Sequence, residues 1–371
     1  MASAFTEEQA ELRSMVRALC AANFSPADVR RDIESEAGYR TEVWQRMATE
    51  LGLQGIVVPE EYGGAGASHT ELCIVIEELG RALAPVPFLS TVAMSANLLL
   101  ATGDRDAQQR LLPGVADGSQ IITVAHHEPA PGTRTSEIAC QATSGDDGWR
   151  LSGTKTHVLA ADQSTSLLVT ARTAEGLSLF EVDAAAPGLE ISPLPTLDST
   201  RRQATVQLRS APAVLIGPQA GAEEALAAMN QRMSAAVCAE NVGGALRLLE
   251  ESAEYARTRE QFGRPIGSFQ AVKQKLAEML LNVELARSAA YQVARTIEDD
   301  DEAVGAEAAM AHALTSEAYI AAAYDTIQVH GGIGFTWEHM AHLYFRRAKT
   351  NAALFGTPDE HRERAAQLMG I

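Results

Sequence analysis

Cysteines are few and widely separated in this chain of 371 residues, and long apolar runs are missing. The cysteines lie dozens of residues apart, without the spacing of a metal site or a redox pair, so reduced thiols are expected; they are Cys20, Cys73, Cys140 and Cys238. No apolar run approaches the roughly 18 residues that a membrane-spanning helix needs. The first residues carry neither the basic nor the apolar segment of a signal peptide. We therefore expect a cytoplasmic protein with no membrane span.

Positive charge is also scarce. The chain has 30 lysines and arginines against 48 acidic residues, a formal net charge of -18. This balance argues against nucleic acid as a partner. An anionic small molecule remains compatible with it, because a few local basic residues can bind such a ligand. Hydrophobic residues make up 46% of the chain, which indicates a globular protein, and its length predicts two or three cores.

Proline is nearly absent from the last 150 residues or so, where only Pro265 and Pro358 follow Pro218. A stretch so poor in proline and rich in alanine, leucine and glutamate predicts long helices. Two apolar stripes with helical spacing support this prediction, one formed by Leu226, Met229, Met233 and Val237 and the other by Val272, Leu276, Leu280 and Val283.

The middle of the chain has a different pattern. Short β-rich runs occur at residues 166–170, 177–182 and 204–208, and the sequence GDDG at residues 145–148 predicts a hairpin turn. The first 120 residues return to helical periods, and Thr6 with Gln9 forms a capping-box pattern. We predict an α+β multidomain protein with a helical domain at 1–120, a β domain at 121–217 and a helical bundle at 218–371.

Three local stretches carry a family resemblance. Residues 255–270 read YARTREQFGRPIGSFQ, residues 328–335 read QVHGGIGF, and residues 58–66 read VPEEYGGAG. In this order, and with α–β–α organisation around them, they resemble the signatures of the acyl-CoA dehydrogenase family across essentially the whole chain. The resemblance implies a middle β-barrel-like domain and a C-terminal four-helix bundle. It also implies FAD as cofactor and α,β-dehydrogenation of an acyl-CoA thioester.

The residue types in the first two stretches suit the ADP half of FAD. Arg259 offers a charge-assisted contact to a pyrophosphate, and glycines let a backbone approach the cofactor closely. The resemblance implies a site shared between two subunits, so at least a dimer is expected. The predicted cofactor-binding residues are Arg259, Gln261, Phe262, Gln270, Gln328, Val329, His330, Gly331 and Gly332.

The catalytic base of the family has no counterpart here. In most members a glutamate stands in a Tyr-Glu-Gly-Thr stretch, which matches Leu354-Phe355-Gly356-Thr357 in this chain, so Phe355 takes the glutamate position. A second group of members places the base at a position that corresponds to Met233. Neither side chain accepts a proton, so no catalytic residue is predicted. Glu240 follows Met233 by two turns and is the remaining candidate base, although an ion-pair role is the favoured interpretation.

The loops that face the flavin in the family depart from its pattern as well. The chain reads His127-Glu128-Pro129-Ala130-Pro131-Gly132-Thr133-Arg134 where the family has a glycine-rich loop that begins with Thr, so His127 replaces that Thr. His157 and Leu159 replace the usual Trp and Thr of the next flavin strand. Hydroxyl donors are therefore lost at both contacts. Glu338, His339 and His342 lack metal-site spacing, so no metal is predicted. Arg347 replaces an aspartate that is usual in the family, which predicts an altered ion pair.

Three functions remain open. The chain is either a self-sufficient acyl-CoA dehydrogenase with an unidentified base, or the FAD-supporting, base-lacking subunit of a heteromeric enzyme, or a flavin monooxygenase on the same fold. Loss of the base together with the flavin loops favours the second, which resembles the heterotetrameric enzymes of sterol side-chain catabolism. The resemblance implies electron-transferring flavoprotein as the electron acceptor. The acyl group and the choice between a homo- and a hetero-oligomer are not determined by the sequence.

Overall fold

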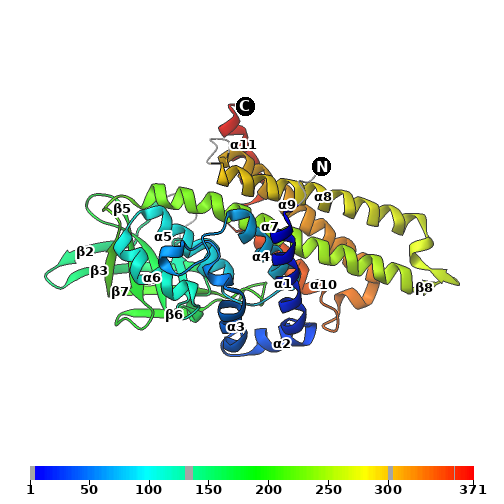
Figure 1. The fold of residues 1–371 in the computed structure, drawn as a ribbon, viewed down its shortest axis with the longest axis horizontal. Coiled ribbons are helices and arrows are strands. Elements are labelled where there is room, and N and C mark those ends of the chain that lie inside the picture. The colour runs from blue at the N-terminus through cyan, green and yellow to red at the C-terminus, as the bar shows by residue number, and fades with distance from the viewer. Residues whose placement is uncertain (1–4, 130–136, 300–303, 355) are drawn as a thin grey trace. The chain divides into compact units, whose positions relative to one another are not determined.

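The computed structural model describes residues 5–129, 137–299, 304–354 and 356–371 (Figure 1). Two compact units divide the chain. The bundle unit comprises Met1–Arg31, His69–Ala84 and Ser234–Ile371. The sheet unit comprises Asp32–Ser68 and Pro85–Met233.

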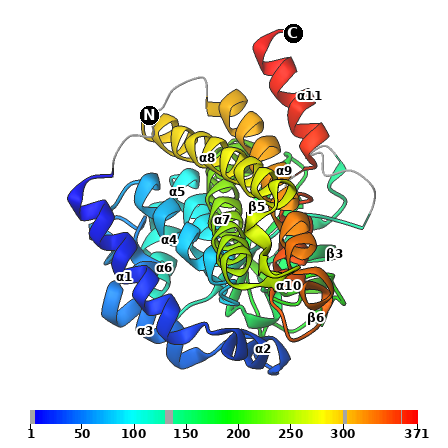
Figure 2. The same cartoon turned by 90° about the vertical axis from the view of Figure 1, so that its right-hand side faces the viewer.

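The bundle unit is helical. Long helices form its centre, where α8 packs against α9, and α9 also contacts α10 and α11 (Figure 2). Among the described residues its helices are α1 (Glu7–Asn23), most of α2 (Pro26–Glu34), α4 (His69–Arg81), most of α7 (Ala222–Thr258), α8 (Gln270–Glu298), α9 (Val304–His330), α10 (Ala341–Asn351) and α11 (Pro358–Met369). A short hairpin of β8 (Glu260–Gln261) and β9 (Arg264–Pro265) with the 3-10 turn η6 (Ile266–Ser268) joins α7 to α8, and the 3-10 turn η7 (Gly331–Phe335) follows α9.

The sheet unit contains a seven-stranded sheet. Strand order runs β1-β4-β2-β3-β7-β5, β6 pairs with β7, and β5 pairs back onto β4, so the strands from β4 to β5 close into a barrel-like ring. Most pairings are antiparallel, whereas β1 and β2 pair with β4 in parallel. The strands are β1 (Ile122–Ala125), β2 (Gln141–Gly145), β3 (Gly148–Leu159), β4 (Ser166–Arg172), β5 (Leu177–Asp183), β6 (Leu189–Pro193) and β7 (Gln203–Ile216).

Short helices complete the sheet unit. Its α-helices in the described residues are α3 (Thr41–Leu51), α5 (Asn97–Thr102) and α6 (Arg105–Ala116), with the π-helix η3 (Leu89–Ala96) and the 3-10 turns η1 (Leu53–Gly55), η2 (Glu60–Tyr62) and η5 (Ala161–Gln163). The indole of Trp44 on α3 is buried and donates to the carbonyl oxygen of Gly118 at 2.9 Å, which ties α3 to the end of α6.

The predicted order of helical, β and helical regions is confirmed. The capping box at Thr6 and Gln9 is present, and Gly145 pairs with Gly148 across the predicted turn. The first stripe is also confirmed, because Leu226, Met229, Met233 and Val237 are all buried.

The second stripe lies on the predicted helix, α8, but it is not buried along its whole length. The side chain of Leu280 is 50% exposed, and α8 buries Met279, Val283 and Ala286 instead. Helix α8 has apolar residues on more than one face, since Leu281 and Leu285 are exposed as well. A periodicity argument cannot choose between two apolar faces of one helix.

A pair of glycines brings three helices close together in the bundle unit. A Cβ at Gly243 of α7 would clash with the backbone carbonyl of Glu77 on α4, and a Cβ at Gly244 would clash with the ring of Tyr319 on α9. Glycine is therefore required at both positions by the close approach of neighbours rather than by backbone angles.

Candidate functional site

The hairpin after α7 presents a strained aromatic residue. Pairing of Gln261 with Arg264 leaves Phe262 and Gly263 as a two-residue turn, and both have positive φ, 54° and 73°. Such turns favour Asn and Gly, so a bulky side chain here is strained. Phe262 is also 92% exposed. A side chain that is both strained and exposed adds nothing to the core, which points to contact with a ligand or a partner.

The polar residues around this turn are accessible. The backbone N–H of Arg259 donates to the carbonyl oxygen of Tyr255 at 2.8 Å, which caps α7 and fixes the start of the hairpin. Within the described ranges the Arg259 guanidinium has no hydrogen-bond or ion-pair partner, and the residue is exposed. Gln261 and Gln270 are exposed too. These donors are therefore available to an anionic ligand.

The second stretch forms the end of α9. Gln328, Val329 and His330 are its last three residues, and Gly331 has a φ of 64°. No heavy atom lies within 4 Å of a Cβ built on Gly331 or Gly332, so the backbone is open to a ligand there. Gln328 is exposed, whereas His330 is buried.

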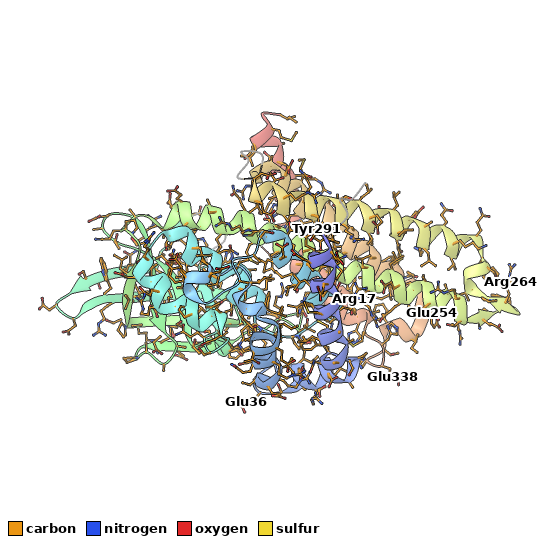
Figure 3. All side chains as sticks on the ribbon, viewed as in Figure 1. Arg17, Glu36, Glu254, Arg264, Tyr291 and Glu338 are labelled. Atoms are coloured by element: carbon orange, nitrogen blue, oxygen red, sulfur yellow. The ribbon has the colours of Figure 1, made fainter. Side chains whose placement is uncertain are left out.

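The two stretches meet at one end of the bundle unit. The rings of Tyr255 and His330 stack with centroids 4.3 Å apart and planes 26° apart, which joins α7 to α9. His330 Nδ1 donates to the carbonyl oxygen of Thr326 at 2.8 Å, so the tautomer and orientation of the ring are fixed. Figure 3 shows Glu254 and Arg264 toward this end of the unit. The sequence did not indicate this ring contact of Tyr255, the first residue of the 255–270 stretch.

Neither position that the sequence predicts for the family base carries a carboxylate. Met233 is fully buried and apolar, and Phe355 lies outside the described residues. Glu240 is buried and forms an ion pair with Arg347, whose Nη1 lies 2.7 Å from Glu240 Oε1. Asn351 Nδ2 donates to Glu240 Oε2 at 2.8 Å. Both carboxylate oxygens of Glu240 therefore accept hydrogen bonds within the bundle.

This ion pair belongs to a buried polar network. Asn351 Nδ2 also donates to Asn241 Oδ1 at 2.8 Å, and Asn241 Nδ2 donates to the hydroxyls of Thr315 and Ser316. The network connects α7, α9 and α10, and it includes the last residue of α10. It therefore fixes the point at which the chain leaves α10.

A second buried ion pair lies in the sheet unit. Lys155 Nζ donates to Glu128 Oε1 at 2.7 Å, to the carbonyl oxygen of His126 and to the Thr170 hydroxyl. Burial is the main cause of the lowered pKa of Lys155. Burial alone would raise the pKa of Glu128, but hydrogen bonds from Lys155 and from two backbone N–H groups hold it below its usual range. Nothing in the sequence spacing had indicated this pair.

Histidines stand near this pair. Burial, followed by the charges of His157 and Lys155, lowers the pKa of His127. His157 has a φ of 52° at a bulge between β3 and β7, and its Nδ1 lies 2.9 Å from Gln203 Oε1. The described residues do not include the loop residues Ala130 to Arg134. Two imidazoles, those of His127 and His157, therefore lie close enough to lower the pKa of His127.

The histidines of the bundle unit form ring contacts. His330 and His339 have centroids 4.4 Å apart, and His342 packs edge-on against Trp337. Burial is the main cause of the lowered pKa of both His339 and His342. In the part of the chain that the structure describes, no three His, Cys, Asp or Glu side chains are grouped to hold a metal ion. The described helices also include none that is long and apolar enough to cross a membrane.

A barrel-like sheet lies between two helical regions along the chain, and comparison with family models agrees with this order. The N-terminal, middle and C-terminal domains of acyl-CoA dehydrogenase match residues 6–119, 123–210 and 220–370. The chain belongs to the acyl-CoA dehydrogenase family.

Similar proteins include one described as a steroid enzyme and one described as a complex. Acyl-CoA dehydrogenase IpdE2 of Mycolicibacterium smegmatis is 33% identical over 359 residues, which cover 97% of this chain and 98% of the relative. A structure described as a Tcur3481-Tcur3483 steroid ACAD variant is 33% identical, covers 98% of each chain and has a TM-score of 0.88. The ChsE4-ChsE5 complex from Mycobacterium tuberculosis is 30% identical, covers 100% of this chain and 99% of that chain, and has a TM-score of 0.91.

Proposed function

We propose that this chain is the base-lacking subunit of a heteromeric acyl-CoA dehydrogenase and contributes the ADP-binding residues of a shared FAD site. The observation that carries the proposal is the state of Glu240. Glu240 is the remaining candidate base, because Met233 and Phe355 have no carboxylate. Arg347 forms an ion pair with one of its carboxylate oxygens, and Asn351 donates a hydrogen bond to the other. A base must be free to take the α-proton of the substrate. The names of the Tcur3481-Tcur3483 and ChsE4-ChsE5 structures, each of which joins two chains, support the heteromer.

The residues at the hairpin end fit the ADP half of FAD. Arg259 has an exposed guanidinium, which suits a pyrophosphate, and the open backbone at Gly331 and Gly332 leaves room for close approach. Phe262 offers an exposed aromatic face to an adenine ring. Gln261, Gln270 and Gln328 add amide donors. The chemistry that FAD supplies when bound is acceptance of the β-hydride of the acyl-CoA thioester.

The partner subunit then supplies the glutamate, and this chain supplies binding and orientation. The substrate proposed is an acyl-CoA with a steroid-derived acyl group, because the similar Tcur3481-Tcur3483 structure is described as a steroid enzyme. Electron-transferring flavoprotein is the proposed acceptor of the electrons. The alternative is a self-sufficient homo-oligomer in which Glu240 leaves its ion pair to act as base.

Flavin content and activity separate the two functions. We would purify the chain alone and co-expressed with an acyl-CoA dehydrogenase chain that keeps the Tyr-Glu-Gly-Thr glutamate, and measure FAD per chain by absorbance. The expected result is fewer flavins than chains, with turnover of acyl-CoA only by the complex. One FAD per chain and turnover by the chain alone would overturn the proposal.

Arg259 tests the shared site. Arg259→Ala removes a charge-assisted hydrogen bond, typically about 1.5–3 kcal/mol, which corresponds to roughly 10- to 100-fold weaker FAD binding by the complex. Arg257→Ala is the matched control, because Arg257 is exposed two residues earlier and pairs with Glu254 on its own helix. Equal FAD affinity for Arg259→Ala and wild type would remove Arg259 from the site.

A further inference from the structure

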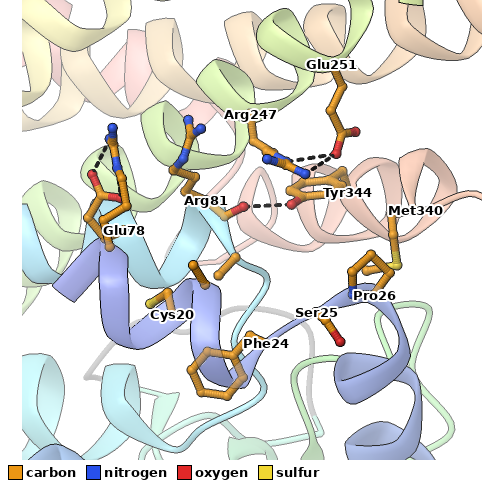
Figure 4. A pocket seen from close by; sticks show the side chains of 13 residues that line it. Cys20, Phe24, Ser25, Pro26, Glu78, Arg81, Arg247, Glu251, Met340 and Tyr344 are labelled. Atoms are coloured by element: carbon orange, nitrogen blue, oxygen red, sulfur yellow. Dashed lines mark hydrogen bonds and ion pairs between the residues drawn. The ribbon is translucent and has the colours of Figure 1, made fainter. Parts of the chain in front are cut away.

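A cavity of about 440 Å³ opens in the bundle unit. The end of α1 and the loop to α2 form one wall, and the end of α4, the second half of α7 and the start of α10 contribute the rest (Figure 4). A cavity of this size is in the range that binds small molecules. None of the predicted FAD-binding residues lines it.

Three arginines from three helices line the cavity: Arg17 of α1, Arg81 of α4 and Arg247 of α7. A carboxylate holds each guanidinium in place. Arg17 donates to Glu78 at 2.9 and 2.7 Å, Arg81 to Glu250 and Arg247 to Glu251 at 2.8 Å. A guanidinium has five N–H groups, so donors remain on each arginine for a ligand. The three cations are pre-positioned before any ligand arrives.

The accessible charge in this cavity is positive. The side chains of Arg17 and Arg247 are 48% and 40% exposed, whereas those of Glu78 and Glu251 are 1% and 22% exposed. Glu78 and Glu251 also line the cavity, but three guanidiniums face only these two carboxylates there, and Arg17 and Arg247 are more exposed than their acidic partners. Glu250 is more exposed, but it is not among the residues that line the cavity. In a chain with a net charge of -18, this is a local site for a negative group.

Part of the remaining lining is apolar. Ala21, Phe24, Pro26, Ala82 and Met340 form a hydrophobic surface beside the arginines. The hydroxyl of Tyr344, at the inner end, already donates to the backbone carbonyl of Arg81 at 2.6 Å (Figure 4). Charged heads beside an apolar surface suit a molecule with an anionic group and a short hydrocarbon body.

We propose that this cavity is a binding site for a small amphipathic anion, in which Arg17 and Arg247 contact the acid group and Phe24 and Met340 contact the apolar body. The site is separate from the FAD-binding residues, so it binds its ligand whether or not a partner subunit and FAD are present.

Calorimetric titration of the purified chain with octanoate tests the site. Octanoate should bind with an affinity that falls as salt is raised, since the arginines are partly exposed. Octylammonium, which has the same tail and the opposite charge, should not compete, and inorganic phosphate should bind more weakly than octanoate. Equal binding of octanoate and octylammonium would overturn the charge argument.

Variants locate the binding. Arg247→Gln and Arg17→Gln should each weaken octanoate binding by roughly tenfold or more, and Ala82→Trp should block it by filling the cavity without a change of charge. Arg46→Gln is the matched control, because Arg46 forms the same i,i+4 pair with Glu50 on α3, outside the cavity. Melting temperature is measured for each variant, and Arg17→Gln alone carries the charge test if Arg247→Gln fails to fold. Unchanged octanoate binding by the arginine variants or by Ala82→Trp would place the anion elsewhere and refute the proposal.

Discussion

Removal of the Arg347 guanidinium is the sharpest test of how the bundle unit is held together. The side chains of Arg347 and Glu240 are only 2% and 7% exposed, and Nη1 and Oε1 are 2.7 Å apart. Arg347→Met keeps most of the volume but leaves Glu240 as a buried charge without its cation. Loss of one partner of a buried pair typically costs about 3–5 kcal/mol, since the charge left behind loses its counter-ion. We expect a loss of this size in the free energy of unfolding.

The assay is urea unfolding followed by circular dichroism at neutral pH, with the double variant Glu240→Gln/Arg347→Met alongside. In the double variant the carboxylate is replaced by a neutral amide whose oxygen still accepts from Asn351, so most of the stability should return. The coupling between the two changes should therefore be large. An Arg347→Met protein as stable as wild type, or a double variant as unstable as the single one, would show that the ion pair does not stabilise the unit.

Other outcomes follow from the same structure. Burial and neighbouring His361 hold the pKa of His312 at about 3. The unfolded chain therefore takes up this proton near its ordinary pKa of about 6.5, whereas the folded chain does so only near about 3. The free energy of unfolding should fall as pH falls from about 6.5 to about 3, and urea unfolding of His312→Phe should show a flatter pH dependence. Gly243→Ala should destabilise the fold by about 1–3 kcal/mol in urea, because its Cβ meets the Glu77 carbonyl. Phe262→Asn should relieve strain and leave the melting temperature equal or higher, while FAD binding by the complex weakens.

The sequence predicted the type and order of the elements well, because proline use and apolar spacing are local properties. It also predicted residues that the structure brings to one end of the bundle unit, since residues 255–270 and 328–335 end neighbouring helices. The ion-pair partner of Arg347 could not be predicted from the sequence. Glu240 lies 107 residues earlier, and the register between α7 and α10 depends on packing rather than on periodicity. The exposure of Leu280 could not be predicted for the same reason, since only the neighbours of α8 decide which of its apolar faces is buried.

The glycine pair in α7 has a consequence for the order of folding. Two adjacent glycines weaken an isolated helix by about 2 kcal/mol relative to alanines, so the centre of α7 gains little from its own propensity. Its stability depends on docking against the Glu77 carbonyl of α4 and the Tyr319 ring of α9. During synthesis α4 emerges long before α7, whereas α9 emerges after it. We expect the middle of α7 to become protected from hydrogen exchange only once α9 is in place, later than the two ends of the same helix.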